Sequence, residues 1–101
     1  MDATPPSSRL DKWLWQARFF KTRALASRMI SRGRIRMNAR RVRKPAAQVR
    51  IGDGLTFAQG DEIRAIRVLG FGTRRGPASE AQLLYEDVAG LRIGEDVDPA
   101  S

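Results

Sequence analysis

Arginine is the residue type whose number and position in this chain point to chemistry. The chain holds 19 Lys and Arg residues against 11 Asp and Glu residues, and only three of the 19 are Lys. Residues 1–50 carry 14 basic and 2 acidic side chains, whereas residues 51–101 carry 5 basic and 9 acidic ones. A surface of mixed sign would serve solubility better than this separation. Because guanidinium groups form forked hydrogen bonds to phosphate and stack on bases, the pattern predicts a nucleic-acid site in the first half.

The residue types that are missing exclude several kinds of site. The sequence has no Cys and no His, so a disulfide framework, thiolate metal ligation and the commonest general base are not available. It has no run of 18 apolar residues and no signal-peptide pattern at its start. At 101 residues the chain has room for one domain. We therefore expect a single cytoplasmic domain with no metal, no cofactor and no membrane segment.

One short motif raises the question of catalysis. Arg9-Leu10-Asp11 is similar to the catalytic Arg-Leu-Asp of pseudouridine synthases, but that motif continues with Thr and Gly-Leu-Leu, whereas Lys12 and Trp13 come next here. No second carboxylate is placed to act with Asp11 as an acid–base pair. We predict that the protein is not an enzyme, and that Asp11 is a charge in the first turn of a helix or a partner for an arginine.

Two short helices are expected in the first third of the chain. Residues 1–8 are predicted to form a disordered arm whose last residue, Ser8, caps a helix that runs to about Phe20. Thr22 is predicted to cap a second helix, which ends at Gly33 in the C′ position. Apolar residues recur at helical spacing in both segments. The predicted buried stripes are Leu10, Trp13, Leu14 and Ala17 in the first helix and Leu25, Ala26, Met29 and Ile30 in the second.

After the second helix the period changes from 3.6 to 2, which indicates strands. Ile35 and Met37 point one way, and Asn38-Ala39 forms a turn into a returning strand around Val42. Because Ala39 disfavours positive φ, we do not expect this turn to have the type I′ form.

The second half is predicted to be mostly strands. The predicted elements are a turn at 52–54, a strand over 55–57, a turn at 59–61, a strand over 63–69, a loop at 71–76 and a helix from about 78 to 87. Ile63 and Ile66 are out of step by one residue, which predicts a bulge near Arg64 and Ala65.

The basic residues gather around one helix start and one hairpin. A helix that begins after Thr22 leaves backbone N–H groups free at the positive end of its dipole, which favours a phosphate. Thr22 acts there as a cap alone, or as a cap that also contacts phosphate. The candidate nucleic-acid-binding residues are Arg9, Lys12, Lys21, Thr22, Arg23, Ser27, Arg28, Arg34, Arg36, Asn38, Arg40 and Arg41.

Aromatic residues and a later arginine pair extend this list. Of Trp15, Phe19 and Phe20, we expect one to be partly exposed, and Trp15 or Phe19 to be able to stack on a base. Arg74 and Arg75 lie in a glycine-rich loop and are either a second nucleic-acid contact or a solvated turn.

The order of these motifs resembles a known family. The segments RLDKWLWQARFFKTRALASRMISRGRIRMN and KPAAQVRIGDGLTF are similar to the RNA-binding domain first named for the fourth protein of the small ribosomal subunit. RRGPASEAQLLYED is similar to a ribosome-associated member of that family, and the resemblance covers about residues 9–88. It implies an α+β fold, the alpha-L motif, in which two N-terminal helices pack on a small twisted antiparallel sheet, with a short C-terminal helix. The RNA would lie along the helices and the hairpin.

The resemblance also implies a function. The expected parts are the arm 1–8, an RNA-binding domain 9–72, a loop and short helix 73–88 packed on it, and an acidic flexible tail 89–101. A protein of this kind binds structured RNA by shape rather than by base order. The ribosome-associated likeness implies large-subunit ribosomal RNA, on stalled or dissociated subunits, and a part in the heat-shock stress response. We also expect a monomer.

The chain departs from the family in two places. The hairpin reads Asn38-Ala39 where the family usually has Asn-Gly, and the acidic GEDVDPAS stands where the ribosome-associated member has a long basic extension. Three alternative functions stay open: a general structured-RNA or tRNA-binding adaptor, a protein–protein adaptor that uses the acidic tail, and a DNA-binding regulator. The last needs base-reading Asn or Gln, whereas residues 22–32 offer only Arg, Ser and Thr as polar side chains.

Overall fold

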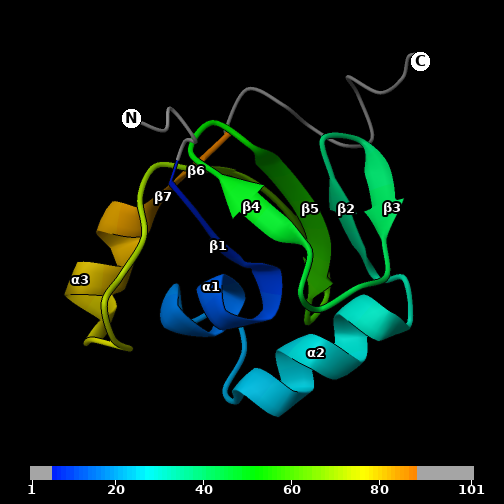
Figure 1. Cartoon of the computed structure of the whole chain (residues 1–101), viewed down its shortest axis with the longest axis horizontal. Helices are drawn as coiled ribbons and strands as arrows, with labels where there is room; N and C mark the ends of the chain where they lie inside the picture. Colours follow the sequence, from blue (N-terminus) through cyan, green and yellow to red (C-terminus); the bar gives the residue numbers. More distant parts are fainter. Residues whose placement is uncertain (1–5, 89–101) are drawn as a thin grey trace, which may run out of the picture.

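A short strand comes first along the chain, two helices follow it, and strands make up most of the remainder (Figure 1). The computed structural model describes residues 6–88, so the predictions made for residues 1–5 and for the tail 89–101 lie outside the described residues. The elements are β1 (Ser7–Arg9), α1 (Leu10–Gln16), α2 (Arg23–Ser31), β2 (Ile35–Met37), β3 (Arg40–Val42), β4 (Gln48–Arg50), β5 (Gly54–Gln59), β6 (Glu62–Val68), α3 (Ala78–Ala81), a 3-10 turn (Gln82–Leu84) and β7 (Tyr85–Asp87).

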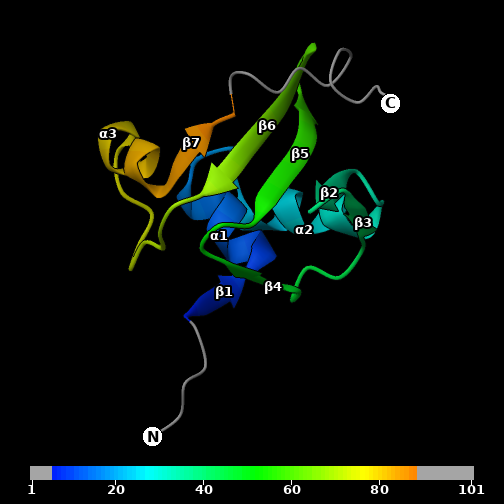
Figure 2. The same ribbon diagram turned by 90° about the horizontal axis from the view of Figure 1, so that it is seen from above.

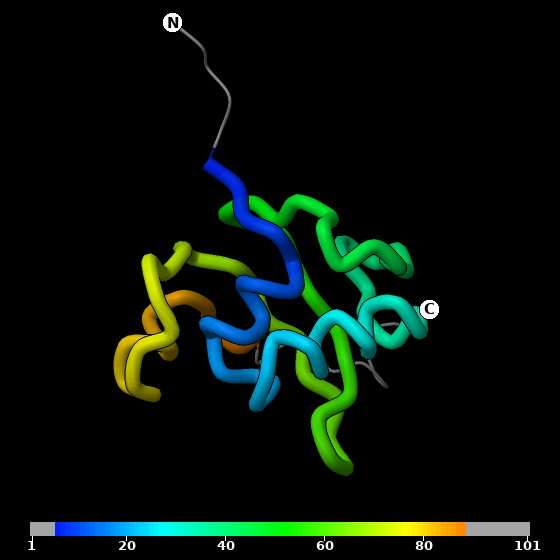
Figure 3. The backbone as a smooth tube through the Cα atoms, turned by 60° about the horizontal axis from the view of Figure 1, so that its bottom comes forward, coloured from blue at the N-terminus to red at the C-terminus, as the bar shows by residue number. Residues whose placement is uncertain are grey.

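Two antiparallel sheets organise these elements. Five strands pair in the order β3-β2-β5-β6-β7, and β1 pairs with β4 in a separate ribbon. α1 and α2 pack against each other (Figure 3). The short α3 lies at the opposite end of the molecule from the β2–β3 hairpin (Figures 1 and 2). The predicted α+β class, with two N-terminal helices packed on antiparallel strands and a short C-terminal helix, is confirmed.

The core lies between the two helices and the inner face of the larger sheet. Burying each large aliphatic side chain stabilises the fold by roughly 1.5–3 kcal/mol. The helices supply Leu10, Trp13, Leu14, Ala26 and Ile30, and the sheet supplies Ile35, Leu55, Phe57, Ile66 and Val68. The predicted stripe of α1 is confirmed, while Leu25 and Met29 of the predicted α2 stripe are only partly buried.

Both predicted ends of α2 are confirmed. The Thr22 hydroxyl accepts a hydrogen bond from the backbone N–H of Leu25 at 3.0 Å. At the other end Gly33 has φ of 73°, and the N–H of Arg34 bonds the carbonyl of Met29 at 3.1 Å. This pattern is a Schellman motif, which only a residue tolerant of positive φ completes without strain.

The predicted bounds of α1 are wrong at both ends. Ser8 is not its N-cap: Ser7 and Ser8, which the sequence places in the arm, lie in β1, and Arg9 precedes the helix without a side-chain cap. The helix ends at Gln16, because Arg18 takes φ of 66° and the N–H of Phe19 bonds the carbonyl of Leu14. A left-handed Arg costs roughly 1–2 kcal/mol. It turns Phe19 and Phe20 into the core, which offsets that cost.

The prediction that the hairpin turn is not of type I′ is also wrong. Asn38 and Ala39 have φ of 53° and 71°, the positive pair that defines this turn. The Asn38 side chain stabilises this type I′ turn. Its Oδ1 accepts from the N–H of Gly54 at 2.9 Å, and its Nδ2 donates to Asp53 at 3.0 Å. These bonds fix the turn against β5 in spite of Ala39.

The predicted bulge in the long strand is absent, since β5 and β6 pair without interruption from Gly54 opposite Arg67 to Gln59 opposite Glu62. Regular alternation instead puts Ile63 on the outer face, where it is 54% exposed. Arg64 takes the inner face, 5.2 Å from the ring of Phe19 and paired with Asp87. The apolar residue that looked out of step is therefore a surface residue.

The predicted helix over 78–87 is shorter, and a strand replaces its second half. α3 ends at Ala81, and β7 adds an edge to the sheet beside β6. The ring of Tyr85 lies 4.6 Å from the ring of Phe19. Pairing with β6 satisfies the backbone and buries Tyr85 at the same time, which a helix leaving the sheet cannot do. β1, β4 and β7 were all missed from the sequence.

Candidate nucleic-acid interface

The buried carboxylate of Asp11, in the first turn of α1, connects α1 with α2. Asp11 is 2% exposed. It accepts hydrogen bonds from both Nε and Nη2 of Arg9, at 3.1 and 3.0 Å, and from the Ser27 hydroxyl at 2.8 Å. Arg23 is its second cation, with Nε 3.5 Å away. We call Arg9, Asp11, Arg23 and Ser27 the Asp11 cluster.

The charge of Asp11 is stable in this setting. Burial by itself would raise the pKa of Asp11. The hydrogen bonds from Arg9, from Ser27 and from the backbone of Lys12 outweigh that effect, and with the charge of Arg23 they lower the pKa. The prediction that Asp11 is an arginine partner is confirmed.

The Asp11 cluster presents two fixed guanidinium groups to solvent. Arg9 and Arg23 side chains remain 46% and 43% exposed although each is held by the carboxylate. Holding them in advance lowers the conformational entropy that a phosphate contact would cost. The α2 N-terminus at Thr22 lies directly before Arg23, so its free N–H groups add to the same positive region. Lys12 and Lys21 are exposed nearby in the chain.

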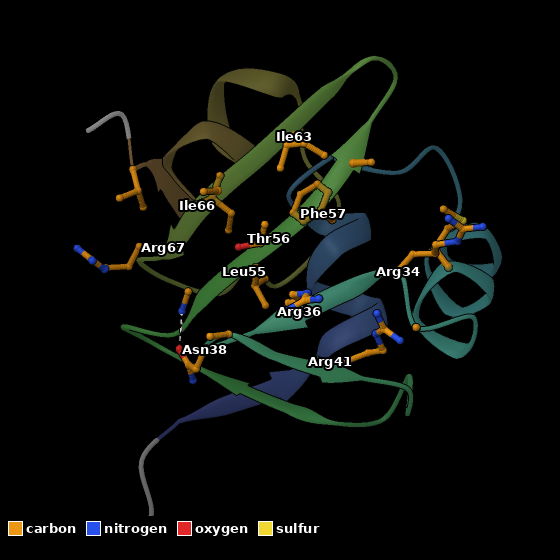
Figure 4. Close-up of a pocket in the computed structure, with 17 residues that line it drawn as sticks. Arg34, Arg36, Asn38, Arg41, Leu55, Thr56, Phe57, Ile63, Ile66 and Arg67 are labelled. Atoms are coloured by element: carbon orange, nitrogen blue, oxygen red, sulfur yellow. Dashed lines mark hydrogen bonds between the residues drawn. The ribbon is translucent and has the colours of Figure 1, made fainter. Parts of the chain in front are cut away.

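A second basic region lies on the face of the larger sheet that points away from the core. Figure 4 shows Arg34, Arg36, Asn38 and Arg41 around a groove of about 760 Å³. We call it the open-face groove. Thr56, Ala65 and Arg67 line it from β5 and β6, and no acidic side chain is among its lining residues.

The candidate residues therefore separate into two surfaces. Arg9, Arg23 and Ser27 meet at Asp11, whereas Arg34, Arg36, Asn38 and Arg41 meet in the open-face groove. The Ser27 and Asn38 side chains already make structural hydrogen bonds. The side chains of the remaining basic candidates are exposed and contact neither cluster: Lys12, Lys21, Arg28 and Arg40.

Sequence reasoning missed one member of the groove. Arg67 follows Ile63 and Ala65 at two-residue spacing, so all three lie on the outer face of β6. The two-residue alternation along β6 indicates that Arg67 faces outward. The bulge expected near Arg64 and Ala65 interrupted this alternation, so Arg67 was not predicted. On β5, Thr56 lies opposite Ala65 and shares this outer face.

The aromatic residues offer less for stacking than expected. Phe19 and Phe20 are 6% and 9% exposed and belong to the core. Trp15 is partly exposed, but Arg75 lies 5.8 Å from its ring centroid and donates to its backbone carbonyl at 3.1 Å. Arg74 is 64% exposed and pairs with Glu80. Both loop arginines thus have partners within the protein.

The part of the chain from residue 6 to 88 offers no cluster of three or more His, Cys, Asp and Glu side chains suited to a metal. Among its helices, none is long and apolar enough to cross a membrane.

Known proteins match both the sequence and the fold. The S4 domain matches residues 8–55, which hold α1, α2 and the hairpin. Fold and site therefore define a protein of the S4-domain class, which binds RNA. Heat shock protein 15 of Escherichia coli strain K12 is 51% identical over 81 residues, 80% of this chain and 60% of that protein. The homolog from Haemophilus influenzae is 44% identical over 79 residues, covering 78% and 60%.

A solved structure extends the match to the whole fold. It is described as a trimeric structure of Vibrio cholerae heat shock protein 15, with a TM-score of 0.81 and 38% identity over 94% of this chain and 95% of that one. The chain belongs to the heat shock protein 15 family of S4-domain proteins. This is a non-catalytic RNA-binding family, in agreement with the prediction that the chain is not an enzyme. The chain spans about 60% of the length of the curated relatives.

Proposed function

We propose that the protein binds large-subunit ribosomal RNA in the cytoplasm and acts on stalled or dissociated subunits during stress. The observation that carries the RNA contact is the Asp11 cluster, where a buried carboxylate fixes Arg9 and Arg23 beside the start of α2. Fixed guanidiniums bind phosphates at set spacing, so they recognise the shape of a folded RNA rather than its bases.

The oligomeric state is a separate point. The Vibrio cholerae relative is described as trimeric, so the prediction of a monomer receives no support from it. The RNA contact proposed here uses residues of one chain and holds for either state.

A single substitution tests the Asp11 cluster. Arg23→Ala should weaken binding to a large-subunit RNA fragment and reduce the slope of log affinity against log salt by about one unit, because one phosphate contact is lost. Fluorescence anisotropy over a salt series measures both quantities. The fold should hold, since Asp11 keeps its hydrogen bonds from Arg9 and Ser27, and Arg23 is a half-exposed side chain that lies 3.5 Å from the carboxylate.

Arg74→Ala is the matched control, because Arg74 is exposed, pairs with one carboxylate and lies outside both basic surfaces. Equal weakening by Arg74→Ala would show that only total charge matters and would contradict the proposed site.

The choice of RNA needs a test in cells. Crosslinking followed by sequencing of the bound RNA should recover large-subunit ribosomal RNA above its share of total RNA. Even recovery of tRNA and small-subunit RNA would favour the general adaptor instead. Equal affinity of the purified protein for duplex DNA at matched salt would favour the DNA-binding alternative.

A further inference from the structure

The open-face groove is strongly basic, and its arginines on β2 and β3 have no ion-pair partner among residues 6–88. Arg36 and Arg41 form no side-chain hydrogen bond or ion pair with any of residues 6–88. Arg67 pairs with Glu86, but at 3.4 Å and with both side chains about half exposed. The groove therefore attracts an acidic occupant.

The groove also has an apolar side. Ile63 is 54% exposed and lies among Ala58, Ala65 and Val88. Covering a large aliphatic side chain that is left in water is favourable, because it removes apolar surface from the solvent. An occupant that combines apolar and acidic side chains fits this surface better than a purely charged one.

The described chain ends at the edge of this groove. The N–H of Val88 bonds the carbonyl of Ala65 at 3.0 Å, so the chain continues from the β6–β7 edge, and Val88 itself lines the groove. The next thirteen residues read AGLRIGEDVDPAS. They begin with the apolar Leu91 and Ile93, and then carry three carboxylates against the single Arg92: Glu95, Asp96 and Asp98.

The length of this segment matches the width of the sheet. From β7 to β3 there are four strand spacings, or roughly 19 Å at about 4.8 Å each. Glu95 follows Val88 by seven residues, which span up to about 23 Å when extended. The acidic residues can therefore reach Arg36 on β2 and Arg41 on β3, while Leu91 and Ile93 come earlier in the segment and can contact Ile63 on β6 on the way.

We propose that residues 89–101 dock across the open-face groove of their own chain. Leu91 and Ile93 cover Ile63, and Glu95, Asp96 and Asp98 pair with Arg36 and Arg41. The acidic segment supplies the counter-charge that Arg36 and Arg41 do not find among residues 6–88, and apolar contact near the attachment point fixes its direction.

A spin label tests this docking without any RNA. Because the chain has no Cys, Ser101→Cys gives a single site for a nitroxide. The label should broaden the amide NMR signals of Thr56 and Ala58 in the groove. The amide signal of Lys21, in the loop just before α2, should stay sharp. Adding E95Q, D96N and D98N should remove the broadening at Thr56 and Ala58.

The matched control changes net charge equally but elsewhere. D2N, D61N and E62Q together should leave the broadening in place. No broadening in the labelled protein, or equal broadening with and without the tail carboxylates, would overturn the proposal. Broadening that requires mixing spin-labelled with isotope-labelled copies would also overturn it, in favour of exchange of the segment between chains.

Docking has a consequence that rests on the proposed RNA-binding function. If the segment fills the groove about four-fifths of the time, RNA that needs the groove binds about five times more weakly than it would to an empty groove. E95Q/D96N/D98N should then bind the RNA about fivefold more tightly than D2N/D61N/E62Q. Unchanged affinity together with positive label data would show that the RNA does not use the groove, and would leave the docking intact.

Discussion

Asp11 shows how one residue can belong to both the fold and the site. The same carboxylate that bonds Ser27 across sixteen positions of sequence also holds Arg9 and Arg23 at the surface. The residue types around it suggested the arginine partners, but the bond from Ser27 depends on how α1 and α2 cross. Ser27, predicted as an RNA contact, thus also helps to hold Asp11 in place through its hydroxyl.

Asp11→Asn should lower the free energy of unfolding by roughly 1–3 kcal/mol near neutral pH, because charge-assisted hydrogen bonds to a buried group are lost. The folded-state pKa of Asp11 is lowered. Its contribution is therefore fully present above the ordinary carboxyl value of about 3.9, and is lost as pH falls through the folded value. Urea denaturation across this range should show a smaller acid loss for the variant.

Asp61→Asn is the control for this comparison, since Asp61 is exposed in the β5–β6 turn. If both variants had the same pH profile, the bonds to Asp11 would not stabilise the fold.

At the scale of elements, local sequence decides where a helix or turn can form, and contacts with distant strands decide where it ends. Thr22 is a residue type that favours a helix N-cap and Gly33 one that favours a helix end, and α2 begins directly after Thr22 and ends just before Gly33. Arg and Ala are residue types that disfavour positive φ, yet Arg18 and Ala39 both take it. In each case burial or hydrogen bonding elsewhere outweighs an unfavourable backbone conformation.

Ala39→Gly should therefore stabilise the protein, by about 1 kcal/mol, because Gly adopts positive φ without the steric cost that Ala carries. Thermal and urea unfolding measure the change. Ala24→Gly, exposed in the first turn of α2, should do the reverse by a smaller amount, since Gly weakens a helix less near its end than in its interior. A loss of stability in both variants would argue against the type I′ turn.

At the scale of the whole molecule, the fold sorts a single arginine-rich stretch onto two surfaces. The Asp11 cluster lies at the helix starts, and the open-face groove lies on the sheet face turned away from the core. Within 6–88 no side-chain hydrogen bond or ion pair joins the two regions.

Arg23→Ala and Arg36→Ala should therefore have additive effects on RNA affinity, within about 0.5 kcal/mol, as expected for distant sites. Each should reduce the salt slope by about one unit if one RNA spans both surfaces. Anisotropy titrations of both single variants and the double variant measure this. An Arg36→Ala variant that binds as well as the parent would confine the interface to the Asp11 cluster.

The sequence by itself determined the separation of charge, the cap of α2 at Thr22, its end at Gly33 and the lack of Cys and His, because these depend on residue type and near neighbours. Only the tertiary structure decided the rest. β1, β4 and β7 exist through pairing with strands far away in the chain, and their short segments carry no periodicity of their own. The division of the arginines between two surfaces could not be predicted from the sequence either, because it depends on which face of the sheet the helices cover.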